Sequence, residues 1–170
     1  MLSLSIYVLI VLALTWCVKS FVFTRAVVDG SSMENTLQNG DNLIVNRMAY
    51  RLGAPERFDI IVFPYKYQKN TYYIKRIIGL PGETVHIDES GVIYINGNEL
   101  KESYGREVIT DAGAASGDVV LGSDEYFVMG DNRNDSNDSR MSDVGNIHRK
   151  EITGKAVLRI WPLEKISQVK

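Results

Sequence analysis

The sequence predicts an all-β domain, built as packed antiparallel sheets or a partly open barrel, with one N-terminal transmembrane helix ahead of it. Three observations predict this fold class. Residues 1–18 contain no charged side chain. From Arg25 onward, short β-branched runs recur at regular spacing without long helical patterns between them. One of these runs meets Asn96-Gly97, a dipeptide typical of a type I′ hairpin turn.

The apolar N-terminal segment has about the length of a membrane span. About 20 residues of helix cross a bilayer, and a lysine near one end, here Lys19, can reach the interface. A cleaved signal peptide is one alternative, but no charged segment precedes the apolar stretch and no small-x-small site is clear near its end. A buried core helix is the other. We expect a transmembrane anchor over residues 1–24 and a β-rich domain over residues 25–170.

The expected strands are short and rich in valine, isoleucine and aromatic residues. They cover residues 27–28, 42–45, 59–63, 71–78, 83–88, 92–95, 126–129 and 156–161. Only residues 46–52 look briefly helical, and residues 111–118 have the composition of a flexible surface loop.

Composition argues against several classes of protein. A length of 170 residues suits one domain with a short appendage, and a net charge of −2 without a basic run argues against nucleic acid as a partner. The single cysteine, Cys17, forms no disulfide within the chain. His86 and His148 lie far apart without a spaced ligand set, so we expect no metal and no cofactor.

Lys75 is the candidate general base. A serine hydroxyl becomes a nucleophile when a base removes its proton, and a lysine amine can act as that base only while neutral. On a strand, Tyr73, Lys75 and Ile77 share one face, so the amine would lie among bulky apolar groups that lower its pKa. Arg76 would point to the opposite face, solvated or paired. The alternative is an ordinary lysine on an edge strand.

Ser32 is the candidate nucleophile, in a short polar turn. Gly30 permits close approach of the backbone, Met33 is expected to be exposed, and the Ser32 N–H could serve an oxyanion hole if the turn is tight. A serine that only caps the turn is the alternative.

The run from Gly130 to Arg140, called the polar loop below, contains hydroxyls, carboxylates and two arginines that could orient Ser32 and Lys75. A solvated loop is one alternative. A calcium loop is another, but the required glycine and terminal glutamate do not follow at the right spacing.

In these segments the chain resembles the bacterial type I signal peptidases, membrane-bound serine–lysine endopeptidases, in the short form with one anchor found in Gram-positive bacteria. Four family motifs occur in order: Ser32-Met33-Glu34-Asn35-Thr36-Leu37, residues 58–63, residues 73–83, and residues 130–140. The last of these matches the family pattern at every fixed position, and the similarity covers about the whole chain.

The resemblance implies a role for each residue of the site. Ser32 would be the nucleophile and Lys75 the general base, and Ser136 would hydrogen-bond the lysine amine and hold it toward Ser32. The remaining supporting residues would be two ion pairs, Asp138 with Arg140 and Asp131 with Arg76.

Three positions depart from the family pattern. Asn35 stands where the family often has proline, which removes one rigid φ constraint from the turn. Gly30 stands where some members have a serine whose hydroxyl lines the oxyanion hole. Phe58 stands where the family has glycine, and we expect this to be a harmless change at a strand edge.

The resemblance also implies an activity and a location. The protein would cleave N-terminal signal peptides from exported preproteins, bound as extended strands with small residues at the first and third positions before the cut. It would be a single-pass protein of the cell membrane with an extracytoplasmic domain. Lys19 and Arg25, at the end of the anchor next to the domain, give a weak charge bias toward the opposite orientation.

Three alternatives remain at this level. A non-catalytic, chaperone-like relative in pilus assembly would lack the serine or the lysine, and both are present. A self-cleaving repressor with a similar β-fold would need a helix-turn-helix where this chain has its apolar segment. A membrane-tethered β-module could use the polar loop to bind a partner.

Overall fold

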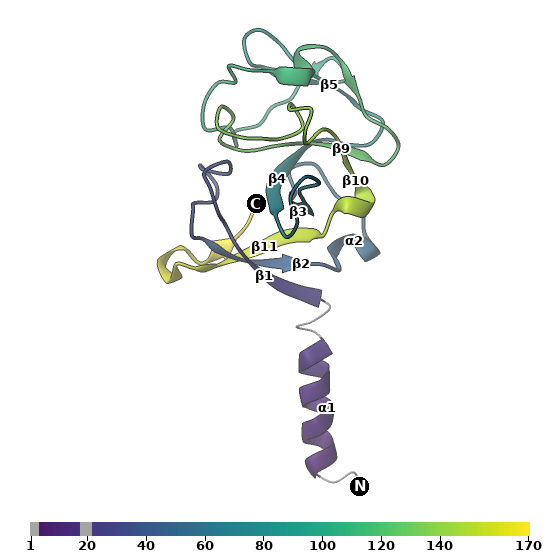
Figure 1. The fold of residues 1–170 in the computed structure, drawn as a ribbon, viewed down its shortest axis with the longest axis vertical. Coiled ribbons are helices and arrows are strands. Elements are labelled where there is room, and N and C mark those ends of the chain that lie inside the picture. Colours follow the sequence, from purple (N-terminus) through teal and green to yellow (C-terminus); the bar gives the residue numbers. More distant parts are fainter. Residues whose placement is uncertain (1–3, 18–21) are drawn as a thin grey trace.

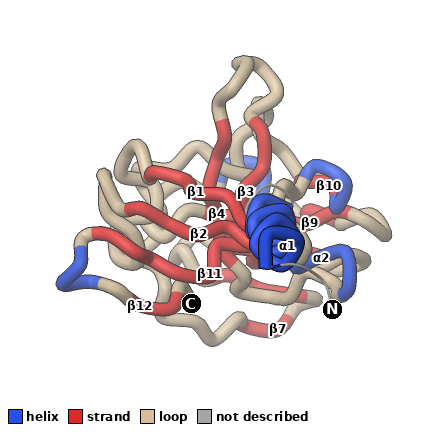
Figure 2. The backbone as a smooth tube through the Cα atoms, turned by 90° about the horizontal axis from the view of Figure 1, so that it is seen from below, coloured by secondary structure: helices blue, strands red, loops and turns tan. Residues whose placement is uncertain are grey.

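A β-rich body and one protruding helix make up the protein (Figure 1). The structure is a computed structural model and describes residues 4–17 and 22–170. Helix α1 (Leu4–Cys17) extends away from the body, and Figure 2 views it end-on. Large apolar side chains of α1 from Leu4 to Leu12 are exposed.

The described part of α1 has 14 residues. Within residues 4–17 and 22–170, no helix combines the length and the apolar character that a bilayer crossing requires. The other residues of the predicted 1–24 anchor include 1–3 and 18–21, which lie outside the described residues.

Two antiparallel sheets form the described body, which confirms the expected β class. The larger has eight strands: β1 (Phe23–Val27), β2 (Asn42–Asn46), β3 (Ile60–Pro64), β4 (Tyr72–Gly79), β9 (Glu125–Met129), β10 (Ile147–His148), β11 (Gly154–Trp161) and β12 (Ser167–Gln168). The smaller has four: β5 (Thr84–Ile87), β6 (Ile93–Ile95), β7 (Asn98–Glu99) and β8 (Val119–Val120). Short helical turns complete the body: α2 (Ala49–Leu52), η2 (Gly113–Ser116), η3 (Arg149–Glu151) and η4 (Leu163–Lys165).

The order of the larger sheet, β1-β2-β11-β3-β4-β9-β10, leaves β1 at one edge and β4 inside. Strand β4 pairs with β3, where Lys75 lies opposite Ile61, and with β9, where Arg76 lies opposite Met129. The β-branched residues of β4 suit a strand buried on both faces. Lys75 and Arg76 are therefore held on a rigid element between two neighbours.

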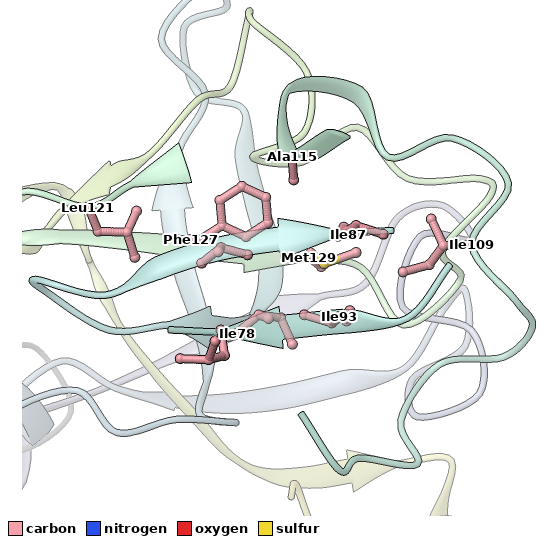
Figure 3. Packing of buried hydrophobic residues seen from close by; sticks show 10 residues of the cluster. Ile78, Ile87, Ile93, Ile109, Ala115, Leu121, Phe127 and Met129 are labelled. Atoms are coloured by element: carbon pink, nitrogen blue, oxygen red, sulfur yellow. The ribbon is translucent and has the colours of Figure 1, made fainter. Parts of the chain in front are cut away.

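The main hydrophobic core joins the two sheets (Figure 3). Isoleucines of β4, β5 and β6 pack there against Phe127 and Met129 of β9. The last residue of β4, Gly79, has no room for a side chain, because a Cβ atom there would collide with the side chains of Val85 and Leu121. The smaller sheet packs at the end of β4 that lies away from α1 (Figure 1).

One expected loop has more structure than its composition indicates. Within residues 111–118, residues 113–116 form the η2 turn, and Ala115 is fully buried in the main core. A flexible surface loop was therefore the wrong interpretation, because an alanine without polar groups fills a space that the two sheets leave between them. The briefly helical segment is also shorter than expected, since α2 spans only Ala49–Leu52.

Candidate active site

Ser32 and Lys75 lie in hydrogen-bond contact. The Lys75 Nζ and Ser32 Oγ atoms are 2.6 Å apart. Lys75 is 3% exposed, and its Nζ atom lies 5.1 Å from the centroid of the Tyr73 ring on the same face of β4. A turn after β1 therefore presents a hydroxyl directly to an amine on β4.

Burial changes the protonation of this amine. The pKa of Lys75 is lowered from about 10.5 to about 8, chiefly by desolvation and to a smaller extent by the Arg140 guanidinium. The carboxylates of Asp138 and Asp131 act in the opposite direction. A substantial fraction of the amine is therefore neutral in mildly alkaline solution and able to accept the Ser32 proton.

The turn around Ser32 is fixed from both sides. Gly30 has φ of 105°, a conformation that glycine adopts without steric cost, and its N–H donates to Asn39 Oδ1. The Asn132 N–H donates to the Ser32 carbonyl oxygen at 3.0 Å. Among the described residues, the Ser32 N–H donates no hydrogen bond, which leaves it able to bind a developing oxyanion.

The expectation of an exposed Met33 is wrong. Met33 is 1% exposed and packs in a core cluster with Leu37 and Leu43. The thioether side chain fills a gap in this core, and its burial anchors the residue that follows the nucleophile.

The pair of Arg76 and Asp131 is completely buried. The guanidinium donates to both carboxylate oxygens, from Nε at 2.9 Å and from Nη2 at 2.7 Å. Thr36 donates its hydroxyl proton to Asp131 and accepts a bond from Arg76. This bidentate pair connects three segments: the turn that carries Ser32, called the nucleophile turn below, strand β4 and the polar loop.

The pair of Asp138 and Arg140 shapes the polar loop. Arg140 Nε donates to Asp138 Oδ1 at 2.9 Å, and Asp138 Oδ2 accepts the N–H of Gly130 at 3.0 Å. Gly130 has no space for a side chain, since a Cβ atom there would collide with the Ser32 carbonyl oxygen and with Ser136.

The structure does not contain the expected hydrogen bond from Ser136 to the lysine amine. The Ser136 hydroxyl is buried and has no partner among the described residues, whereas the amine is bonded to Ser32. The loop places this hydroxyl against Gly130.

Two departures from the family pattern occupy unusual backbone conformations. Asn35 has φ of 101°, which a proline ring cannot adopt. Phe58 has φ of 72°, a left-handed conformation that is a genuine outlier for a bulky residue. Phenylalanine in place of the family's glycine therefore strains the backbone at this position. Phe58 also lies beside the site, since Arg76 Nη1 donates to its carbonyl oxygen.

A cleft lies beside the pair of Ser32 and Lys75, which we call the dyad. Small and aliphatic residues, including Ala26, Val28 and Ile74, line it together with Gly30, and Asp135 and Asn137 border it.

Sequence reasoning missed Thr36 and the backbone of Asn132. Both lie inside the matched motifs, but a motif gives no hydrogen-bond partner for them. Within residues 4–17 and 22–170 no cluster of three histidine, cysteine or acidic residues could hold a metal ion.

Comparison with known proteins gives one consistent result. The family model described as signal peptidase, peptidase S26, matches residues 1–161. Signal peptidase I P from Bacillus subtilis subsp. natto is 37% identical over 170 residues, covering 96% of this chain and 90% of that protein. Signal peptidase I from Bacillus caldolyticus is 38% identical over 161 residues, covering 88% and 85%.

A crystal structure of a signal peptidase I from Enterococcus faecalis V583 is 35% identical, with a TM-score of 0.49, and covers 59% of this chain and 95% of that chain. The family match extends over nearly the whole sequence and includes all four motifs around the dyad. The chain belongs to the signal peptidase family, peptidase S26.

Proposed function

We propose that Ser32 and Lys75 perform the peptidase reaction of this protein, as nucleophile and general base. As a signal peptidase, the protein is a hydrolase that cleaves signal peptides from preproteins in protein secretion. The observation that carries the assignment is the contact of 2.6 Å between the Ser32 hydroxyl and a buried lysine amine.

The reaction follows from this geometry. Lys75 takes the proton of Ser32 while Ser32 Oγ attacks the scissile carbonyl carbon. The Ser32 N–H donates to the resulting oxyanion. When the carbon–nitrogen bond breaks, the Lys75 ammonium returns the proton to the departing amine, and an acyl-enzyme remains. Water, activated by the same amine, then hydrolyses the ester and frees Ser32.

Ser136 has a supporting role in this proposal. Its buried hydroxyl has no partner among the described residues and lies against Gly130, next to the Ser32 carbonyl oxygen. When Ser32 is acylated, the amine loses its hydroxyl partner, and Ser136 is available to accept a bond from it. The ion pairs Asp138–Arg140 and Asp131–Arg76 hold the loop and β4 in place during both steps.

The cleft favours an extended peptide. Strand β1 is an edge strand of the larger sheet, and residues of β1 line the cleft next to Ser32. A preprotein can add a strand at such an edge, and shallow pockets between aliphatic side chains admit only small residues. Small residues at the first and third positions before the cut are therefore part of the proposal.

The proposal includes a membrane anchor over residues 1–24 and an extracytoplasmic peptidase domain over residues 25–170. The support is the uncharged stretch of residues 1–18 and the exposure of large apolar side chains along α1. Such a surface is unfavourable in water and favourable in a lipid bilayer. The protein would therefore be a single-pass protein of the cell membrane.

Substitution of each dyad residue tests the assignment. Ser32→Ala and Lys75→Ala are each expected to lower cleavage of a preprotein by several orders of magnitude, because nucleophile and base act as a unit. Ser142→Ala and Lys69→Ala, at exposed positions, are matched controls and are expected to cleave like the parent. Cleavage by a clean preparation of either dyad variant at the parent rate would contradict the assignment. Failure of the parent protein itself to cleave a preprotein would favour the chaperone-like alternative.

A further inference from the structure

Two residues with left-handed backbone conformations contact the same tyrosine. Asn35, with φ of 101°, donates from Nδ2 to the carbonyl oxygen of Tyr104 at 3.0 Å. The ring of Phe58, with φ of 72°, lies 5.0 Å from the Tyr104 ring, measured between centroids. Asparagine tolerates this conformation, but phenylalanine does so only where its surroundings impose it. Tyr104 therefore contacts two positions whose backbone conformation is constrained.

Tyr104 also covers the cation that follows the proposed base. Its ring centroid is 3.7 Å from Cζ of the fully buried Arg76, a stacking contact in which Tyr104 itself is partly exposed. Arg76 follows Lys75 on β4 and donates to the Phe58 carbonyl oxygen. The backbone carbonyl of Tyr104 thus meets the turn that carries Ser32 through Asn35, and its ring meets Arg76 on the strand that carries Lys75.

The segment around Tyr104, residues 102–106, is tied to the polar loop at both ends. Glu102 forms a buried ion pair with Arg133 at 2.8 Å. The Arg106 N–H donates to the Asp131 carbonyl oxygen at 2.8 Å. We refer to residues 102–106 as the clamp segment. Its two ties make it a firm support rather than a loose surface loop.

A second contact joins the clamp segment to the nucleophile turn. The Arg106 guanidinium pairs with Glu34 at 2.5 Å, and both side chains are partly exposed. Exposed ion pairs contribute little stability. The Asn35 bond is exposed too, but it ends on the backbone of Tyr104, whose ring lies on the fully buried Arg76. The Asn35 bond and the Tyr104 stack are therefore the contacts that connect the turn to a buried residue. All of these contacts lie outside the cleft, and none involves a residue that lines it.

We propose that Tyr104 and the clamp segment act as a positioning element that holds the Ser32 turn against Lys75. The inference rests on the proposed function of the dyad. Tyr104 touches neither the cleft nor the dyad, so it acts through Asn35 and Arg76. A displacement of the hydroxyl by about 1 Å from the base can lower a rate by about a hundredfold. A tie between the turn and β4 therefore has a direct effect on catalysis.

Substitution of Asn35 tests the hydrogen bond without introducing backbone strain. Asn35→Gly removes the side-chain amide but keeps the left-handed conformation accessible. We expect kcat for preprotein cleavage to fall by about tenfold, with KM changed by less than about twofold, because only positioning is lost. Asn70→Gly is the matched control, since Asn70 has φ of 60° and is exposed. It is expected to keep the parent kcat.

Substitution of Tyr104 tests the ring. Tyr104→Leu removes the stack on Arg76, whereas Tyr104→Phe keeps the ring and is expected to restore kcat to within about twofold of the parent. In Tyr104→Leu, water gains access to the loosened site, so we expect the pH midpoint of kcat/KM to shift upward from about 8. A purely structural role would lower thermal stability without moving this midpoint.

The combination Asn35→Gly/Tyr104→Leu completes the cycle. Coupling through one segment predicts that the double variant loses less than the product of the two single effects. Parent-like kcat and pH profiles in both single variants would overturn the clamp, and so would a loss confined to the melting temperature. Failure of the dyad assignment is distinguishable, because it would appear as cleavage by Ser32→Ala.

Discussion

The two faces of β4 offer different partners to two neighbouring cationic residues. Lys75 and Arg76 are both buried, at 3% and 0% exposure. Arg76 meets a carboxylate, Asp131, in a bidentate ion pair. Among the described residues, the Lys75 amine has only the hydroxyl of Ser32 within hydrogen-bond distance. Arginine keeps its charge in proteins, while a desolvated lysine readily loses its proton. The partner, and not burial alone, therefore separates a structural cation from a candidate base.

Removal of each cation gives the largest expected contrast. Arg76→Met leaves the Asp131 carboxylate buried without its partner and is expected to lower the free energy of unfolding by about 3–5 kcal/mol. Lys75→Met, the matched change on the other face, removes a costly buried amine and is expected to leave stability unchanged or higher while abolishing cleavage. Denaturant unfolding measures both. Equal destabilisation by the two variants would remove the distinction between the faces.

The pH dependence of cleavage sharpens the same contrast. Because the pKa of Lys75 is lowered to about 8, the neutral fraction of the amine rises with pH and levels off above this value. We expect kcat/KM to rise by about a hundredfold between about pH 6 and pH 9 and then to reach a plateau. A rate that continues to rise until about pH 10.5 would show that the amine is solvated.

Stability is expected to follow the same titration. Between about pH 8 and about pH 10.5, Lys75 binds more protons in the unfolded chain than in the folded protein. The unfolding free energy contributed by this group therefore increases with pH across that window, and the contribution is lost as pH falls to about 8. Comparison of the parent with Lys75→Met across this range isolates the contribution.

The smallest expected effect concerns Ser136. Its buried hydroxyl has no hydrogen-bond partner among the described residues, so Ser136→Ala is expected to leave the unfolding free energy unchanged or to raise it by about 1 kcal/mol. Cleavage is expected to fall by about tenfold, because the acyl-enzyme lacks a second partner for the amine. A variant that is destabilised and fully active would contradict both parts.

The strands of the fold could be predicted from local patterns. The β-branched run of residues 71–78 becomes β4 almost unchanged, and Asn96-Gly97 forms the turn between β6 and β7. These features depend on residues that are neighbours in the sequence, where alternation and turn chemistry act directly.

Contacts between distant segments could not be predicted in this way. Asn35 and Tyr104 are separated by 69 positions, and neither residue belongs to a pattern that indicates the other. The burial of Met33 and the left-handed φ of Phe58 have the same origin, because tertiary packing sets both. The motifs predicted which side chains meet at the dyad, but not the elements that support them.

The burial of Lys75 makes the proposed peptidase dependent on its own folding. In an unfolded chain the same lysine is hydrated and keeps a pKa near 10.5, so it is protonated in neutral solution and cannot activate Ser32. The base comes into existence only when the nucleophile turn, β4 and the polar loop have assembled. A newly made chain is therefore expected to have no peptidase activity until the sheet has formed, without the need for a separate inhibitor.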